Sequence, residues 1–163
     1  MAKKTIVGTI ASAAIALGVS IAEPQEGYIG YVYRDAVGVL TYCYGETENA
    51  KSMQGRKFSE QECHALLVKR MAHYDQGNEA CVKNWSALPV ETRGAFDSFS
   101  YNVGNGAFCG STAARYLRSG NIAAACNAML SWNKGTVKGE KVELPGLTKR
   151  RVVERNICLR GAA

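Results

Sequence analysis

Residues Glu26 to Thr47 read EGYIGYVYRDAVGVLTYCYGET, and this stretch combines a β-hairpin pattern with a group of polar side chains. Residues 31–44 are mostly aromatic or β-branched, with Gly38 inside the run and Gly45 directly after it. Short runs of such residues bounded by turn-forming glycines are typical of paired strands. The stretch therefore predicts a small hairpin sheet near the start of the chain.

Two acids and a threonine in this stretch could act together on a sugar bond. A glycosidase needs one carboxylic acid to protonate the leaving oxygen and a second carboxylate to act at the other face of the sugar. Glu26 follows an apolar helix, where desolvation could keep it protonated, while Asp35 begins the hairpin and could stay charged. Thr41 could share a water with Asp35. The spacing of these three residues is weak evidence by itself, since average composition gives it by chance in roughly a few per cent of chains. Taken singly, each of the three is an ordinary surface, turn or strand residue.

Helical signals dominate the rest of the chain. Ser59 and Glu62 form a capping-box pattern, which opens a helix whose apolar residues share one face. One small sheet followed by helices predicts an α+β fold with two lobes. The face of that first helix holds Cys63, Leu66, Leu67, Met71 and Tyr74. Later signals are Pro89 as a first helical residue, Phe96, Phe99 and Val103 at helical spacing, Gly120 and Asn121 as a stop and a new start, a helix end near Trp132, and Pro145 before a last basic helix towards Cys158.

An uncharged run from Thr5 to Ala22 precedes the quoted stretch, and Lys3 and Lys4 precede the run. Its length, roughly eighteen residues, is about the minimum for crossing a bilayer. The two lysines predict a cytoplasmic N-terminus and an exported remainder of the chain. We therefore expect a targeting segment in residues 1–22, which contacts the inner membrane, and one globular domain in residues 23–163.

The composition of this run bears on its fate. Its large aliphatic residues would contribute about −2 to −4 kcal/mol to insertion, and its many Ala, Gly, Ser and Thr residues offset much of that. This favours a signal-anchor-release segment, which tethers the domain and later leaves the membrane, over a signal peptide cleaved after Ala22, for which Ser20 and Ala22 supply the small residues. A buried N-terminal helix of a cytosolic domain is disfavoured, because the run has no polar stripe.

Cysteine content and charge restrict the class of protein further. Six cysteines in an exported chain predict three disulfides, with fifteen possible pairings, and six buried thiols in a cytosolic protein are the alternative. The cysteines and the two histidines do not complete a zinc pattern, so no metal is expected. The net charge of +6 favours polyanionic partners, but no basic recognition helix or aromatic–basic alternation supports nucleic-acid binding.

The quoted stretch resembles the active-site segment of phage-type lysozymes, the muramidase family of bacteriophage endolysins. That family has a Glu, eight residues, an Asp or Cys, five residues and a Thr, which fall here on Glu26, Asp35 and Thr41. The likeness continues through ETRGAFDSFSYNVGNGAF, STAARYLRSGN and PGLTKRRVVERNICL, and so covers nearly all of residues 26–160. It implies a two-lobed lysozyme-like fold, with a small N-terminal β-hairpin lobe and a larger helical C-terminal lobe.

The resemblance also implies roles for individual residues. They are Glu26 as the general acid, Asp35 as the partner carboxylate, Thr41 as the water-positioning group, Tyr101 and Asn102 as lining of the cleft, and Arg150 as the arginine that pairs with the catalytic glutamate. Arg151 is an alternative to Arg150, and without the family both would be interpreted as a solvated helix face. No cofactor is implied, because acid–base chemistry needs none.

The function implied is that of an endolysin that hydrolyses the β-1,4 bond between N-acetylmuramic acid and N-acetylglucosamine in peptidoglycan, with inversion, and so lyses the host. The enzyme would be monomeric, exported, tethered to the inner membrane and then periplasmic. A lytic transglycosylase needs only one acid and is disfavoured because Asp35 and Thr41 both serve a water. A non-catalytic wall-binding or membrane-disrupting protein would use only the basic charge and the apolar N-terminus.

This chain departs from the family where Gly-Tyr-Gly-His-Thr is common, because residues 43–47 read CYGET. The cysteine at position 43, where the family pattern has its first glycine, fits a disulfide-bearing branch of the family. Resemblance to that branch implies the pairs Cys43–Cys63 and Cys126–Cys158 and leaves Cys81–Cys109 as the third.

Some released endolysins are held inactive by a cysteine at the catalytic position, which a thiol of the anchor later frees. Here Asp35 occupies that position and no cysteine precedes Cys43, so this control is absent. Glu26 lies four residues beyond Ala22, and we expect a membrane-embedded anchor to hold it at the lipid surface until release.

Overall fold

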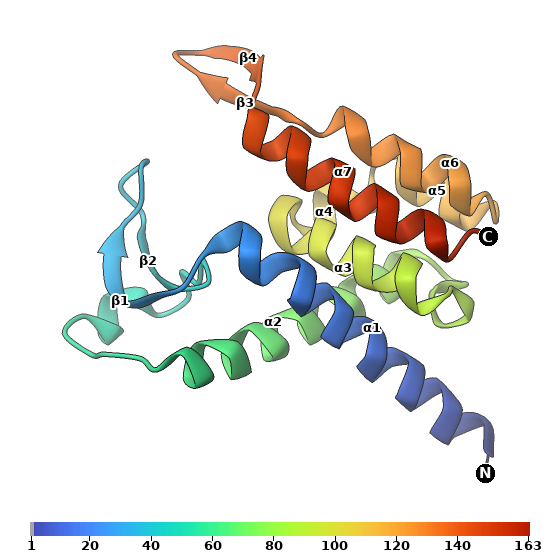
Figure 1. Cartoon of the computed structure of the whole chain (residues 1–163), viewed down its shortest axis with the longest axis horizontal. Helices are drawn as coiled ribbons and strands as arrows, with labels where there is room; N and C mark the ends of the chain where they lie inside the picture. The colour runs from blue at the N-terminus through green and yellow to red at the C-terminus, as the bar shows by residue number, and fades with distance from the viewer. Residues whose placement is uncertain (1) are drawn as a thin grey trace.

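The computed structural model describes the backbone of residues 2–163 and the side chains of residues 12–163, and it shows two lobes connected by long helices (Figure 1). This arrangement confirms the α+β fold with a small hairpin lobe and a larger helical lobe. The elements are α1 (Ala2–Glu26), β1 (Ile29–Arg34), β2 (Leu40–Cys43), η1 (Ala50–Met53), α2 (Glu60–Cys81), η2 (Trp85–Ala87), α3 (Val90–Val103), α4 (Asn105–Cys109), α5 (Thr112–Arg118), α6 (Ile122–Ala128), η3 (Met129–Ser131), β3 (Lys134–Val137), β4 (Glu140–Glu143) and α7 (Pro145–Arg160).

The small lobe is built on the predicted hairpin. Strands β1 and β2 are antiparallel, with Tyr33 opposite Thr41 and an irregularity in the pairing between Ile29 and Tyr33. The ring of Tyr42, in β2, stacks on that of Phe58, with centroids 4.8 Å apart. This stacking ties the hairpin to the segment that leads into α2.

The larger lobe is organised around α3, whose central residues are buried, between α1, α2 and α7 (Figure 1). Both halves of the Ser59–Glu62 capping box are present at the start of α2, and Asn121 caps α6 as predicted. Pro89 differs by one position, because it precedes the first turn of α3 as the N-cap. The pattern did not predict the β3–β4 hairpin.

Helix α1 continues through the expected boundary between residues 22 and 23. From residue 12 onwards it packs against α3, with Ala14, Val19 and Ala22 buried. The approach is close: a Cβ atom added at Gly94 of α3 would lie 2.9 Å from the carbonyl oxygen of Ala14. A packed N-terminal helix was disfavoured for lack of a polar stripe, and this is corrected: α1 packs on the domain through a buried face of alanines and aliphatic residues, Ala14, Val19, Ile21 and Ala22.

Two predictions about residues 1–22 concern the membrane: the length of the apolar run and the lysines that set its orientation. Among the described residues, no helix is long and apolar enough to cross a bilayer. Lys3 and Lys4, whose charges predict the orientation, lie outside the residues whose side chains are described.

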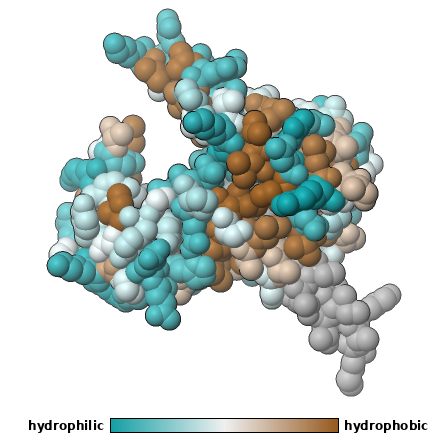
Figure 2. Space-filling view, viewed as in Figure 1, coloured by the Kyte–Doolittle hydropathy of each residue, from teal (hydrophilic) through white to brown (hydrophobic). Residues whose placement is uncertain are grey.

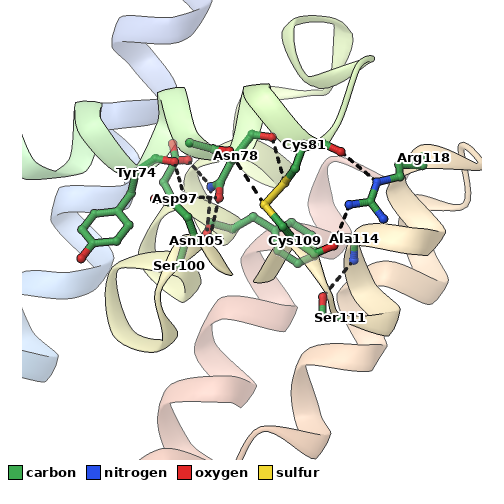
Figure 3. Close-up of a disulfide and its surroundings, with 12 residues drawn as sticks. Tyr74, Asn78, Cys81, Asp97, Ser100, Asn105, Cys109, Ser111, Ala114 and Arg118 are labelled. Atoms are coloured by element: carbon green, nitrogen blue, oxygen red, sulfur yellow. Dashed lines mark hydrogen bonds between the residues drawn. A yellow bond between two sulfur atoms is a disulfide. The ribbon is translucent and has the colours of Figure 1, made fainter. Parts of the chain in front are cut away.

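Three disulfides join elements that are distant in sequence. They are Cys43–Cys63 between β2 and α2, Cys81–Cys109 between α2 and α4, and Cys126–Cys158 between α6 and α7. These pairs confirm the connectivity implied by the resemblance, and the alternative of six free thiols is wrong. At the second disulfide Arg118 donates hydrogen bonds to the carbonyl oxygens of Cys81, at 2.8 Å, and Cys109, at 2.6 Å (Figure 3). One guanidinium therefore fixes the backbone on both sides of this disulfide.

A buried carboxyl group lies under α1. Asp97 of α3 is fully buried, and a Cβ atom added at Gly18 of α1 would come within 3.1 Å of its Cβ atom. Its Oδ1 accepts a hydrogen bond from Asn78 Nδ2 at 3.1 Å, whereas Oδ2 has no hydrogen-bond partner among the described residues. Burial raises the pKa of Asp97 well above its ordinary value, and the charge of Asp75 raises it further, against the lowering effects of Asn78 and Arg93.

We expect the stability of the wild type to fall as pH rises through the pKa of Asp97. The Asp97→Asn variant should not show this fall. Because the pKa of Asp97 is higher in the folded chain, its contribution to stability is complete below the ordinary value of 3.8 and is lost as pH rises through the folded value. In urea unfolding from about pH 4 to pH 8, with the disulfides intact, the variant should gain about 1 kcal/mol or more on the wild type. Glu79→Gln, on the exposed face of α2, is the control. Parallel curves for Asp97→Asn and the wild type would contradict this expectation.

Candidate active site

A cleft of about 410 Å³ separates the small lobe from the helices of the larger one. Figure 2 shows the molecule hollowed between these two parts. The walls come from the end of α1, the segment after β2, and helices α2 and α3. The lining residues are Glu26, Gly45, Glu46, Thr47, Arg70, Tyr74, Tyr101 and Asn102.

Glu26 is the last residue of α1, and its carboxylate forms part of the cleft wall. The side chain keeps 22% of its exposure. Oε1 accepts a hydrogen bond from Arg150 Nη1 at 2.5 Å, and Oε2 would lie 3.3 Å from a Cβ atom added at Gly45. Gly45 has a φ of +84°, so glycine is favoured there both by the backbone conformation and by the nearby carboxylate. One carboxylate is thus held at the cleft by a guanidinium behind it.

The two candidate arginines are distinguished by their contacts. Arg150 pairs with Glu26 and also donates from Nε to Glu154 Oε1 at 3.1 Å. Arg151 does not reach Glu26; it donates to Glu154 Oε2 at 2.5 Å and to Asn102 Oδ1. Both arginines are buried, so a solvated helix face is the wrong interpretation. Arg150 therefore holds Glu26, and Arg151 holds the neighbouring cleft residue.

Tyr101 and Asn102, at the end of α3, both line the cleft as expected. The Tyr101 hydroxyl donates to the carbonyl oxygen of Tyr44 at 2.5 Å, which connects the large lobe to the end of the hairpin. Burial raises the pKa of Tyr101 above its ordinary value, and the charge of Glu26 raises it further. The phenol is therefore a neutral hydrogen-bond donor, and it fixes the relative position of α3 and the small lobe at the cleft.

Asp35 and Thr41 lie on the hairpin beside the cleft, and neither lines the cavity that contains Glu26. Asp35 Oδ1 accepts hydrogen bonds from the backbone N–H groups of Val37, at 3.0 Å, and Val39, at 2.8 Å. Thr41 is buried opposite Tyr33. Desolvation raises the pKa of Tyr33, and the charges of Asp35 and Glu26 raise it further. Both carboxylates therefore act on the same phenol, although only Glu26 reaches the cavity.

Sequence reasoning missed an ion pair in the cleft wall. Glu46 and Arg70 form a two-pronged pair, and Glu46 Oε1 also accepts from the backbone N–H groups of Thr47, at 2.8 Å, and Glu48, at 2.7 Å. Glu46 was noted only as a departure from the family pattern. Arg70 lies between Leu67 and Met71 on the apolar face of α2, and a cation on such a face was an available signal. Within the part of the chain that the structure describes, no group of acidic, histidine or cysteine side chains could hold a metal ion.

Comparison with known proteins identifies the family. The Phage lysozyme family model matches residues 23–154. A SAR-endolysin of Bacteriophage PS119 is 39% identical, over 98% of this chain and 95% of its own length. Two solved structures are similar. The muramidase domain of SpmX from Asticaccaulis excentricus has a TM-score of 0.78 at 25% identity, covering 87% of this chain and 94% of that one. An endolysin from Escherichia coli O157:H7 phage FAHEc1 has a TM-score of 0.76 at 28% identity, covering 88% of this chain and 90% of that one. The chain therefore belongs to the phage lysozyme family, in its SAR-endolysin branch.

Proposed function

We propose that this enzyme hydrolyses the β-1,4 bond between N-acetylmuramic acid and N-acetylglucosamine in peptidoglycan, with inversion at the anomeric carbon. The observation that carries the proposal is the Glu26 carboxylate in the wall of the cleft, held by Arg150 at 2.5 Å. A cleft of about 410 Å³ has room for a sugar ring beside that carboxylate. Family membership supports peptidoglycan as the substrate.

Glu26 is the general acid in this scheme and protonates the leaving oxygen. Asp35 and Thr41 act on the attacking water from the hairpin side. Inversion would need a water between the two carboxyl groups, which then stand about 6.5–9.5 Å apart. The backbone N–H groups of Val37 and Val39 hold Asp35 in one orientation. In this scheme the acid comes from the end of α1 and the attacking water is held on the hairpin side.

Three further residues bind or position the substrate in this proposal. Asn102 is exposed in the cleft, and its Oδ1 is occupied by Arg151, so its amide N–H groups remain to donate to a sugar. The rings of Tyr101 and Tyr74 pack edge-to-face in the cleft wall, with centroids 5.5 Å apart. Arg150 acts through Glu26, because its guanidinium fixes the carboxylate rather than the sugar.

The products of digestion test the reaction type. Purified peptidoglycan would be digested with oxidised protein, and the new ends identified by mass and their anomeric configuration by NMR. Reducing muramic ends that appear first as the α-anomer support inverting hydrolysis. Ends of β configuration would refute inversion, and anhydro ends would assign a lytic transglycosylase. Clearing of cells without new ends would indicate a membrane-disrupting protein.

We also propose that residues 1–22 tether the monomeric enzyme to the inner membrane after export, and that the intact chain is later released into the periplasm. The burial of Ala14, Val19 and Ala22 in the folded domain favours release over cleavage, because cleavage after Ala22 would remove these buried contacts. A membrane-embedded segment cannot make these contacts, and Glu26 would stay at the lipid surface. N-terminal sequencing of periplasmic enzyme tests this: a start at Glu23, or full activity of a tethered form, would contradict it.

A further inference from the structure

The turn that follows β2 (residues 43–47, the Gly45 turn) lies against the carboxylate of Glu26. Oε1 of Glu26 is held by Arg150 at 2.5 Å, so Oε2 is the oxygen left to carry the proton for the leaving group. A Cβ atom added at Gly45 would lie 3.3 Å from Oε2. A turn placed further in would cover this oxygen, and a turn placed further out would admit water to it. The position of the Gly45 turn therefore bears directly on the acid.

Hydrogen bonds within the turn fix its shape. The backbone N–H groups of Tyr42 and Glu46 each donate to the carbonyl oxygen of the other, at 2.9 Å. Between them Cys43 and Gly45 have φ angles of +55° and +84°, a left-handed conformation that residues with a side chain rarely adopt. Both partners of each bond belong to the same small segment. These bonds therefore do not set where the turn lies against α2 and α3.

Contacts with the two helices decide where the turn lies. Its start is tied to α2 by the disulfide of Cys43 and to α3 by the hydrogen bond that Tyr44 accepts. Its end is tied to α2 by Arg70, whose Nε and Nη2 both donate to the carboxylate of Glu46, at 3.0 Å for Nη2. Of these three contacts, that of Arg70 is the one that follows Gly45. It therefore places the second half of the turn.

The carboxylate of Glu46 passes this contact on to the backbone. It is 7% exposed, and its Oε1 accepts from the backbone N–H groups of Thr47, at 2.8 Å, and Glu48, at 2.7 Å. Arg70 also donates to the carboxylate of Glu48. A guanidinium presents its donors in a rigid planar fork, so it fixes a carboxylate in direction as well as in distance. Arg70 is thus connected through Glu46 to the amides that come directly after the turn.

We propose that Arg70 is a positioning residue for the reaction, which acts through Glu46 to hold the Gly45 turn in its place beside Glu26. The inference rests on the proposed function, in which Glu26 is the general acid. An acid must lie within hydrogen-bond reach of the oxygen that it protonates, and a misplacement of about 1 Å can cost about 10²-fold in rate. Arg70 and Glu46 line the cleft, but each is occupied by the other. Their role is therefore in the chemical step and not in binding the sugar.

The test measures kcat and KM on soluble, uncross-linked peptidoglycan strands, with the disulfides intact and below the temperature at which each variant unfolds. Arg70→Met removes every donor and keeps a long unbranched side chain. It should lower kcat about tenfold or more and change KM less than about threefold. Arg70→Lys should retain more activity, because it keeps the charge and can still donate to Glu46. Arg56→Met breaks an exposed pair with Glu62 away from the cleft and should match the wild type within about twofold.

A double-mutant cycle makes the test independent of the stability of Arg70→Met. That variant leaves Glu46 as a nearly buried carboxylate without its cation, which by itself destabilises a fold. Glu46→Gln removes this charge and still offers an oxygen to the two backbone N–H groups. If the pair acts as a unit, Glu46→Gln and the double variant should each lower kcat about as much as Arg70→Met alone.

The contrary results are distinct from one another. An unchanged kcat in the double variant, or single losses that multiply in it, would overturn the inference. A rise of KM at unchanged kcat would show that the pair binds the sugar, and the inference would again be wrong. The proposed function survives either result if the wild type produces reducing muramic ends and Glu26→Gln does not. If the wild type produces no such ends, the proposed function fails and this inference fails with it.

Discussion

Replacing Glu26 with glutamine should lower the rate of peptidoglycan hydrolysis by about a thousandfold or more. Glutamine keeps the size of the side chain and can still contact Arg150, but it has no proton to give to the leaving oxygen. General acid catalysis contributes typically about 10²–10⁴ in rate, and no other carboxylate lining the cleft is free, because Glu46 is held by Arg70. Initial rates on soluble strands, measured with the disulfides intact, give the ratio.

Glu23→Gln is the matched control for this experiment. Glu23 lies one helical turn earlier in α1 and contacts His64, away from the cleft. It should leave the rate within about twofold of the wild type, since an exposed ion pair contributes little to stability. More than a tenth of the wild-type rate in Glu26→Gln would mean that another group protonates the leaving oxygen.

Glu154→Gln should destabilise the fold by about 3–5 kcal/mol. The carboxylate is fully buried and accepts hydrogen bonds from Ser98 Oγ at 2.8 Å, from Arg150 Nε and from Arg151 Nη1. Its neutralisation leaves two buried guanidinium groups with Glu26 as their one carboxylate partner among the described residues. The penalty of burying an uncompensated charge then falls on the core between α3 and α7.

Urea unfolding at neutral pH measures this loss, and Glu140→Gln on the exposed β4 strand is the control. Activity at a temperature where Glu154→Gln stays folded gives a second readout. It should also fall, because Glu154 orients Arg150 and Arg150 orients Glu26. A loss of stability below about 1 kcal/mol would show that the two arginines find other partners or water.

The elements that the sequence predicted correctly are those with local signals. The hairpin follows from β-branched and aromatic residues between glycines, and α2 and α6 begin where Ser59 and Asn121 cap them. Such signals involve groups within a few residues of one another, so one sequence suffices to find them. The β3–β4 hairpin has exposed strands and no alternation of apolar residues, and it was missed for that reason.

The site could be predicted from the residues only in part. Glu26 and Arg150 are 124 positions apart, and no local pattern relates them. The family resemblance supplied the pair, and it could not supply Arg70, which forms its ion pair with a glutamate where the family commonly has a histidine. The docking of α1 was misjudged because its close approach to α3 depends on Gly94, a residue far away in the sequence that lies against Ala14 and Leu17.

The pairing of the six cysteines has a consequence for how the protein matures. The first cysteine in the chain pairs with the second, the third with the fourth and the fifth with the sixth. If the polypeptide emerges into an oxidising compartment from its N-terminal side, each bridge can close before the next cysteine emerges. Thiol–disulfide exchange is slow when wrong bridges must be reshuffled. Here the native bridges are those between successive cysteines, so oxidation in order of emergence gives the correct set without an isomerase.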